Sequence, residues 1–301
     1  MITLAQNAMK LLAFDEEAVA ALEEDMRTIC GHKQAQCVFD ECLQVYRQDI
    51  HSLNKEWLDR IAEAAQTAGI HPYRAHMLLF LCLSNHLRTV YQKNGIDDEI
   101  WKNSMLDLKW KLWECKAVKG TWGTFVPHWF LGFFHMTRFA LGRLQFEIVN
   151  CKTNYEKNGK TLTPESKVIN VHIPRTLTPL DHASCIDAYR QAVRFFESQF
   201  QDAPMAFVCS SWLLYPPTKD ILPPTSNLRP FMADFDVILQ KEDPEGERPN
   251  AWRLFDMDDT GNVEDYPENS SLRRAYKQYL KHGGRMGSGY GVFFASDQDF
   301  L

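Results

Sequence analysis

The sequence lacks any apolar run long enough to cross a bilayer. Its longest such run, Met77 to Leu83, falls far short of the roughly 20 residues that a membrane-spanning helix needs. The first residues, Met-Ile-Thr-Leu-Ala-Gln-Asn, also lack a basic region followed by an apolar core. We therefore expect no signal peptide, no membrane contact and a cytoplasmic location.

Positive charge is not in excess either. Lys and Arg number 33 against 39 Asp and Glu, which gives a formal net charge of -6. Recognition of phosphate backbones needs a basic face, so this balance argues against a nucleic-acid partner. Residues 241–268 hold ten acidic and three basic side chains. We interpret this stretch as a solvated loop, and an acidic rim that attracts a cationic amine is the alternative.

Cysteine is present but follows no pattern. The eight cysteines have no regular spacing, which in a cytoplasmic protein indicates reduced thiols. Segment 30–42 holds three cysteines and one histidine, but their spacings match no zinc site. The segment from Asp256 to Gly261 begins like a calcium loop, yet Pro267 occupies the position of the bidentate glutamate. The sequence therefore predicts no bound metal.

A length of 301 residues predicts two domains, and a hydrophobic content of 45% is enough for a core in each. The first part, 1–118, has repeated helix signals. Asp15, Asn54 and Asp97 or Asp98 stand at N-cap positions, and Pro72 suits a first helical turn. We expect five helices that form a bundle, at about 15–31, 36–48, 54–69, 72–95 and 97–115.

The pattern changes in residues 119–301, where short strands and helices alternate. Segments 143–149 and 167–173 alternate polar and apolar residues around a polar turn and predict an antiparallel hairpin. Thr178 is expected to cap the following helix, with Pro179 at its first position. These signals predict an α+β domain with a mixed sheet and flanking helices.

Further elements of this second part are expected as follows. The prolines at 216–217 and 223–224 argue against regular structure between them, and the glycines of 283–291 suggest a flexible lip over a site. We expect further strands at 205–209, 235–239, 252–257 and 292–295, and helices at 226–231 and 272–280.

Several segments, together with the helical first third, resemble one known family. The segments are Val-His-Ile-Pro (171–174), Leu-Thr-Pro-Leu (177–180), Cys-Ser-Ser-Trp-Leu-Leu-Tyr-Pro (209–216), Leu-Pro-Pro-Thr-Ser-Asn-Leu (222–228) and Gly-Ser-Gly-Tyr-Gly (287–291). The family is that of bacterial GNAT-like acyltransferases, which join a helical N-acyltransferase N-terminal domain to a GNAT-like C-terminal domain. The resemblance implies a helical domain over 1–118 and a GNAT-like domain over 119–301.

The resemblance also implies an acyl-CoA site and no metal. GNAT-like enzymes bind the pantetheine chain where two neighbouring strands splay apart, and bind the pyrophosphate at the start of the following helix. By this resemblance, Arg175, Thr176 and Thr178 are the expected carrier-binding residues. The family's glycine-rich turn is replaced here by 174–179, which contains no glycine. This departure leaves open a remodelled site, a different carrier or none.

Transfer of an acyl group to an amine needs a base for the amine proton. Glu147 and His172 lie on adjacent expected strands, and either is a candidate. Tyr290, with Tyr215 as an alternative, is a candidate acid. A solvent-facing glutamate, a half-buried histidine and packed tyrosines are the corresponding structural interpretations. By position in the resemblance, the expected substrate-lining residues are Ser211, Trp212 and Asn227.

These observations favour an acyl-CoA-dependent N-acyltransferase that joins a small-molecule acyl donor to an amine acceptor by direct transfer. A non-catalytic ligand- or partner-binding module on a degenerate GNAT scaffold is the first alternative. A thiol-dependent enzyme is the second, with Cys209 as nucleophile and His172 or His182 as its partner.

Overall fold

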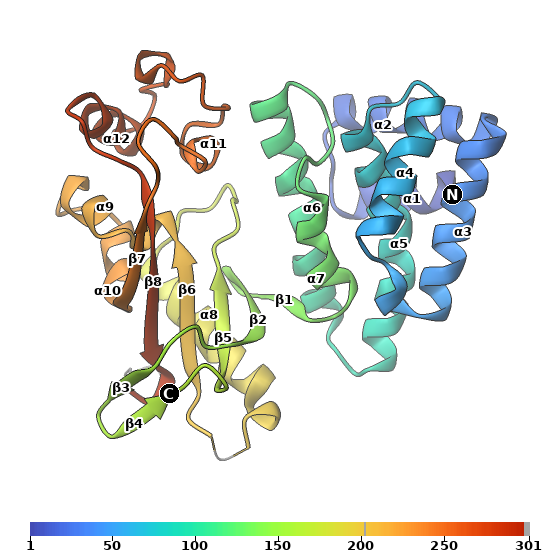
Figure 1. Ribbon diagram of the computed structural model, residues 1–301. Coiled ribbons are helices and arrows are strands. Elements are labelled where there is room, and N and C mark those ends of the chain that lie inside the picture. Colours follow the sequence, from blue (N-terminus) through green and yellow to red (C-terminus); the bar gives the residue numbers. More distant parts are fainter. Residues whose placement is uncertain (202, 298–301) are drawn as a thin grey trace. The chain divides into compact units, whose positions relative to one another are not determined.

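The computed structural model (Figure 1) describes residues 1–201 and 203–297. The chain separates into two compact units, Met1–Ala140 and Leu141–Leu301. This division lies later than residue 118, where the helix signals end. Within the described residues, no helix has both the length and the apolar character needed to cross a membrane.

The first unit is helical. Asn54 accepts a hydrogen bond from the Trp57 amide at 3.1 Å, and Asp97 accepts one from the Glu99 amide at 2.8 Å, so both act as the expected N-caps. The first helix was not expected, since no side chain caps its start. The helices are α1 (Ile2–Leu11), α2 (Glu16–Gly31), α3 (Lys33–Gln48), α4 (Lys55–Thr67), α5 (Pro72–Lys93), α6 (Asp98–Lys119) and α7 (Leu131–Phe134).

Helix α5 is the centre of this unit, because its segment from Met77 to Leu83 is buried on all sides. It contacts α1, α2, α3, α4 and α6. The ring of Phe80 lies 4.8 Å from that of Phe130 and 5.0 Å from that of Phe134, measured between centroids. Residues 119–140 thus contribute aromatic side chains to the core of the helical unit.

The chain forms a six-stranded sheet in the order β1-β2-β5-β6-β8-β7, of which β1 spans the boundary between the units and the other strands belong to the second unit. β2 and β5 pair antiparallel, as the alternating pattern predicts, and β5 and β6 pair parallel. The mixed sheet therefore agrees with the expected α+β class. Its strands are β1 (Arg138–Leu141), β2 (Leu144–Asn150), β5 (Lys167–His172), β6 (Ala206–Ser211), β7 (Asp236–Glu242) and β8 (Gly287–Phe294).

The two faces of the sheet are covered differently. Helix α8 (His182–Phe196) packs on one face (Figure 1), where Tyr189 contacts Phe146, Phe207 and Phe293 at ring-centroid distances of 5.1 to 6.4 Å. Part of the opposite face is covered by a hairpin of β3 (Tyr155–Lys157) and β4 (Lys160–Leu162). The expected polar turn is therefore itself a small two-stranded sheet.

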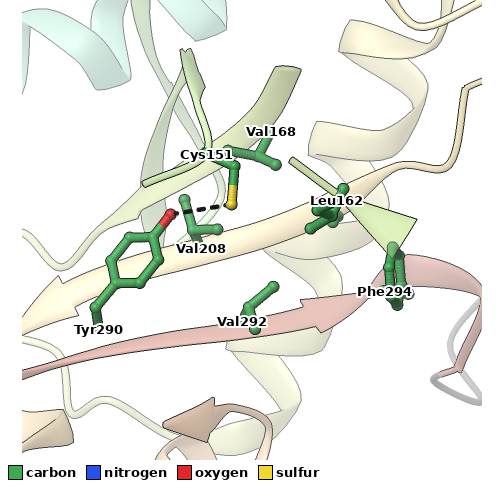
Figure 2. Packing of buried hydrophobic residues seen from close by; sticks show 8 residues of the cluster. Cys151, Leu162, Val168, Val208, Tyr290, Val292 and Phe294 are labelled. Carbon is green, nitrogen blue, oxygen red and sulfur yellow. Dashed lines mark hydrogen bonds between the residues drawn. The ribbon is translucent and has the colours of Figure 1, made fainter. Parts of the chain in front are cut away.

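Figure 2 shows the apolar half of that opposite face. Leu162 of β4 packs in a cluster with the sheet residues Val168, Val208 and Val292. Side chains alternate between faces along a strand, so Asn170 and His172 lie on the same face as Val168. The other half of this face is therefore polar, and it holds the candidate site.

Two short segments differ from expectation. Segment 252–257 is not a strand, because Ala251, Leu254 and Phe255 are buried at helical spacing and form α11 (Ala251–Phe255). The Pro216-Pro217 pair does not prevent regular structure, since the two prolines occupy the first turn of α9 (Pro216–Ile221). The remaining helices agree with expectation, namely α10 (Leu228–Ala233) and α12 (Ser271–Lys281).

The glycine run is also not a flexible lip, since Gly287, Gly289 and Gly291 lie inside β8. A Cβ atom at Gly289 would lie 2.1 Å from the carbonyl oxygen of Leu214. The glycines are needed because the turn at 212–214 packs directly on the backbone of this strand.

Candidate functional site

The two candidate bases, Glu147 and His172, are in contact. His172 Nε2 lies 2.7 Å from Glu147 Oε1, and the two side chains are 20% and 16% exposed. The pairing of β2 with β5 produces this contact, because it places Glu147 opposite Asn170, two residues before His172 on the same face. Both side chains still reach solvent.

Asn170 completes the cluster. Its Nδ2 lies 3.3 Å from Glu147 Oε1 and 3.1 Å from His172 Nε2. Asn170 is not among the functional residues that the sequence predicts. The signal that could have found it is its position two residues before His172, which puts both side chains on one face of a strand.

The parallel pairing of β5 with β6 ends beside this cluster. It joins Ile169 to Phe207 and Asn170 to Val208, and both strands continue for at least two residues beyond that point. Beyond Asn170 and Val208, the register of these two described strands contains no further partners. Such strand ends can pair with an extended ligand, as the resemblance implies for pantetheine.

The helix after β5 begins later than expected. Thr178 is not its N-cap; Asp181 is, since its Oδ1 accepts a hydrogen bond from the Ser184 amide at 2.9 Å. A carboxylate also interacts better than a hydroxyl with the positive end of the helix dipole. Thr176 and Thr178 lie in the preceding loop, where their hydroxyl oxygens are 2.9 Å apart. The amide of Thr178 is therefore not at the helix start.

Arg143 holds this loop in place. Its guanidinium donates hydrogen bonds to the carbonyl oxygens of Pro174, Pro179 and Thr178, at 3.1 to 3.3 Å. These three bonds hold the backbone at 174 and at 178–179. The loop therefore has a defined shape although it contains no glycine.

Arg175, the expected phosphate ligand, forms a two-bond ion pair with Asp256. Asp256 also accepts a hydrogen bond from Arg273 Nη2 at 2.5 Å. One carboxylate thus pairs with two guanidinium groups, which leaves a net positive charge on the three, and Arg175 itself remains 42% exposed. Asp256 falls in the expected strand 252–257, and sequence spacing has no signal for a contact between residues that are 81 positions apart.

Tyr290 is on the same face as the cluster but is engaged elsewhere. Its hydroxyl accepts a hydrogen bond from the Lys152 amide at 3.3 Å and lies 3.7 Å from the sulfur of Cys151 (Figure 2). Burial raises the pKa of this hydroxyl. Tyr215, the alternative acid, donates to Glu242 at 2.9 Å. Both geometries favour structural roles for these tyrosines.

The three expected lining residues lie at separate places. Ser211 ends β6, and its hydroxyl accepts a hydrogen bond from the Leu213 amide at 3.1 Å. Trp212 packs edge-on against Tyr276 at 5.9 Å between ring centroids. Asn227 donates to the carbonyl of Leu180, in the loop before α8, at 3.0 Å. Of the three, Ser211 is the one on β6, beyond the residues of that strand that pair with β5.

Cys209 does not fit the thiol-dependent mechanism. Its side chain is 1% exposed, and burial raises the pKa of its thiol to about 12. A nucleophilic cysteine needs an accessible thiolate near neutral pH. Cys209 is therefore a core residue, which removes the second alternative.

This conclusion predicts a contrast in thiol reactivity. Under native conditions at pH 8, iodoacetamide should label the exposed Cys37 at least about 100-fold faster than Cys209. Peptide mass spectrometry measures both sites in one sample, and both should react after denaturation. Rapid native labelling of Cys209 would restore the thiol-dependent mechanism.

The acidic stretch 241–268 is partly neutralised within the fold. Glu264 pairs with Lys281 at 2.7 Å, Glu268 with Lys277 at 3.0 Å and Asp259 with Arg248 at 3.2 Å. These pairs weaken the interpretation as an amine-attracting rim. No group of three or more potential metal ligands occurs among the residues that the structure describes.

Comparison with solved structures shows the same fold in acyltransferases. One, in complex with decanoyl-CoA and teicoplanin, has a TM-score of 0.71 at 19% identity, over 96% of this chain and 87% of that chain. An acyltransferase mutant with octanoyl-CoA has a TM-score of 0.71 at 18% identity over the same shares. A third, with CoA and 10C-teicoplanin, has a TM-score of 0.65 at 17% identity, over 96% and 99%.

These identities show a shared fold alone, and no curated protein matches the sequence. Family models give the more specific result. The model described as the N-acyltransferase N-terminal domain matches residues 4–136. The model described as the GNAT-like C-terminal domain matches residues 139–293, more than half of the chain. The chain therefore belongs to the family of proteins with a GNAT-like C-terminal domain, preceded here by an N-acyltransferase N-terminal domain.

Proposed function

We propose that this protein is an acyl-CoA-dependent N-acyltransferase that passes the acyl group directly from the thioester to an amine. The observation that supports this most strongly is the 2.7 Å contact of His172 with Glu147, on a strand whose parallel pairing ends at the same point. A base thus lies beside backbone that suits an extended pantetheine chain.

The chemistry balances with His172 as the proton carrier. The amine nitrogen forms a bond to the thioester carbonyl carbon, and the carbon–sulfur bond breaks. His172 accepts the proton that the amine loses and returns it to the departing thiolate. Glu147 stabilises the imidazolium in between. No separate tyrosine acid is needed, which agrees with the engaged hydroxyls of Tyr290 and Tyr215.

The carrier's phosphates would be held by Arg175 and the threonines of the loop before α8. Thr176 and Thr178 supply hydroxyl groups, and Arg175 is sufficiently exposed to meet an anion. Asp181 occupies the helix start itself, so the binding position is shifted into the loop relative to a glycine-rich turn. A phosphate that binds Arg175 would compete with the carboxylate of Asp256.

The donor and acceptor classes have indirect support from the similar structures. These hold decanoyl-CoA, octanoyl-CoA or CoA, and two of them also hold teicoplanin or its 10C form. A small-molecule acyl donor and an amine on a second small molecule are therefore the substrates to test first.

A non-catalytic binding module is the second candidate function. The observation that favours it is Asp181, because a carboxylate at the helix start repels the phosphates that a GNAT-like site places there. The two functions differ in the fate of acyl-CoA. A catalyst must bind it and release CoA in the presence of an amine, whereas a non-catalytic module releases no CoA.

Thermal unfolding with and without acyl-CoA tests the carrier site. A hundredfold excess over the dissociation constant should add about 2.7 kcal/mol to the free energy of unfolding. Arg175→Ala should reduce this shift, whereas Arg194→Ala, which removes an exposed arginine at the end of α8, should leave it unchanged. Acyl transfer is then followed as thiol release with a panel of amines that includes teicoplanin. Absence of any shift with acetyl-, octanoyl- or decanoyl-CoA would refute the proposal.

A further inference from the structure

Three polar atoms meet between β2 and β5, and their distances restrict where the protons lie. Glu147 Oε1 is 2.7 Å from His172 Nε2 and 3.3 Å from Asn170 Nδ2. An ionised carboxylate only accepts hydrogen bonds, so Nε2 of His172 must carry a proton. The lone pair of the neutral ring is then on Nδ1.

The orientation of the Asn170 amide follows from the same acceptor. If the amide were turned over, its Oδ1 would face Glu147 Oε1 at 3.3 Å, and two acceptors would repel each other. With Nδ2 toward Glu147, both Asn170 and His172 donate to one oxygen. The 3.1 Å separation of Nδ2 and Nε2 is then the distance between two donors that share an acceptor.

We infer that Asn170 is a positioning residue, which orients the Glu147 carboxylate so that His172 keeps its proton on Nε2. The inference rests on the proposed function for its catalytic consequence, but its tautomer statement stands independently. Asn170 sits directly opposite Glu147 in the ladder, so its amide reaches the carboxylate without leaving the strand.

The neighbours of the His172 imidazole on this face indicate how a charged residue at position 170 would change its pKa. On this face, β2 contributes Gln145 and Glu147 next to β5, and the register of β6 places Val208 and Ser210 on the other side. Glu147 is the charged group of these four. A second carboxylate at position 170 would therefore act on His172 directly and raise its pKa.

Two variants separate orientation from charge. Asn170→Leu keeps the size of the side chain but removes both amide donors, and it should lower kcat about tenfold with little change in KM for acyl-CoA. Asn170→Asp should move the acidic limb of the kcat–pH profile upward by about one unit, since His172 must be neutral to act. Asn94→Leu, at an exposed helix end, is the matched control and should change neither quantity.

Nitrogen-15 spectra of histidine-labelled protein test the inference without any substrate. Above the imidazole pKa, His172 should be the Nε2–H tautomer in the wild type and a mixture of tautomers in folded Asn170→Leu. A wild-type Nδ1–H tautomer, or an unchanged tautomer in folded Asn170→Leu, would overturn the role of Asn170. Because the spectra need no acyl-CoA, they remain decisive if the proposed transferase activity is not found.

Discussion

Replacement of His172 by alanine is expected to lower kcat for acyl transfer by about 10²- to 10⁴-fold, the usual contribution of a general base. The imidazole is the group that takes the amine proton, so its loss leaves the amine protonated as the carbon–nitrogen bond forms. Acyl-CoA binding should persist, because the proposed phosphate contacts come from the loop at 175–178. Steady-state kinetics combined with the thermal shift by acyl-CoA measures both effects.

Glu147→Gln should have a smaller effect, about 10- to 100-fold in kcat, because glutamine still occupies the site but cannot stabilise the imidazolium with a negative charge. His282→Ala is the control, since His282 is an exposed histidine at the end of α12. If His172→Ala keeps kcat within a few-fold of the wild-type value, the base must lie elsewhere.

Replacement of Gly289 by alanine is expected to lower the free energy of unfolding by about 3 kcal/mol or more. The added Cβ would lie 2.1 Å from the carbonyl oxygen and 2.5 Å from the carbonyl carbon of Leu214. Both are backbone atoms, so no side-chain rotation relieves the overlap, and either β8 or the turn at 212–214 must move. The urea midpoint of unfolding should fall accordingly.

Gly31→Ala provides the contrasting control. Gly31 closes α2, and the described structure places no neighbouring atom within 4 Å of its added Cβ. Alanine favours a helix over glycine by up to about 1 kcal/mol, so this variant should equal or exceed the wild type in stability. Equal midpoints for Gly289→Ala and the wild type would show that the strand tolerates a side chain there.

Several elements could be predicted from local chemistry. Asn54 caps α4 and Pro72 begins α5, as their residue types favour. The period-two pattern of 143–149 and 167–173 predicts strands, and β2 and β5 are paired strands. These signals are readable because each involves residues within one turn or one strand.

The wrong predictions share a cause, because in each case the local sequence fits two different structures. Segment 252–257 is too short for periodicity to separate strand from helix, and burial of Leu254 and Phe255 decided for the helix. Thr178 and Asp181 both suit an N-cap, and the carboxylate makes the stronger bond to the helix amides. The glycines of β8 resemble a loop in sequence, but the close approach of Leu214 requires them within a strand.

For the candidate site, the sequence by itself determined the residue types and the strands that carry them: Glu147 on one and His172 on the next. Only the tertiary structure decided that the two touch, because a shift of one residue in the β2–β5 register would send one side chain to the opposite face. The same holds for Arg175, whose contact with Asp256 depends on how the loop before α8 packs against α11 and α12. Local propensity acts over a few residues, whereas these contacts require the whole sheet to form.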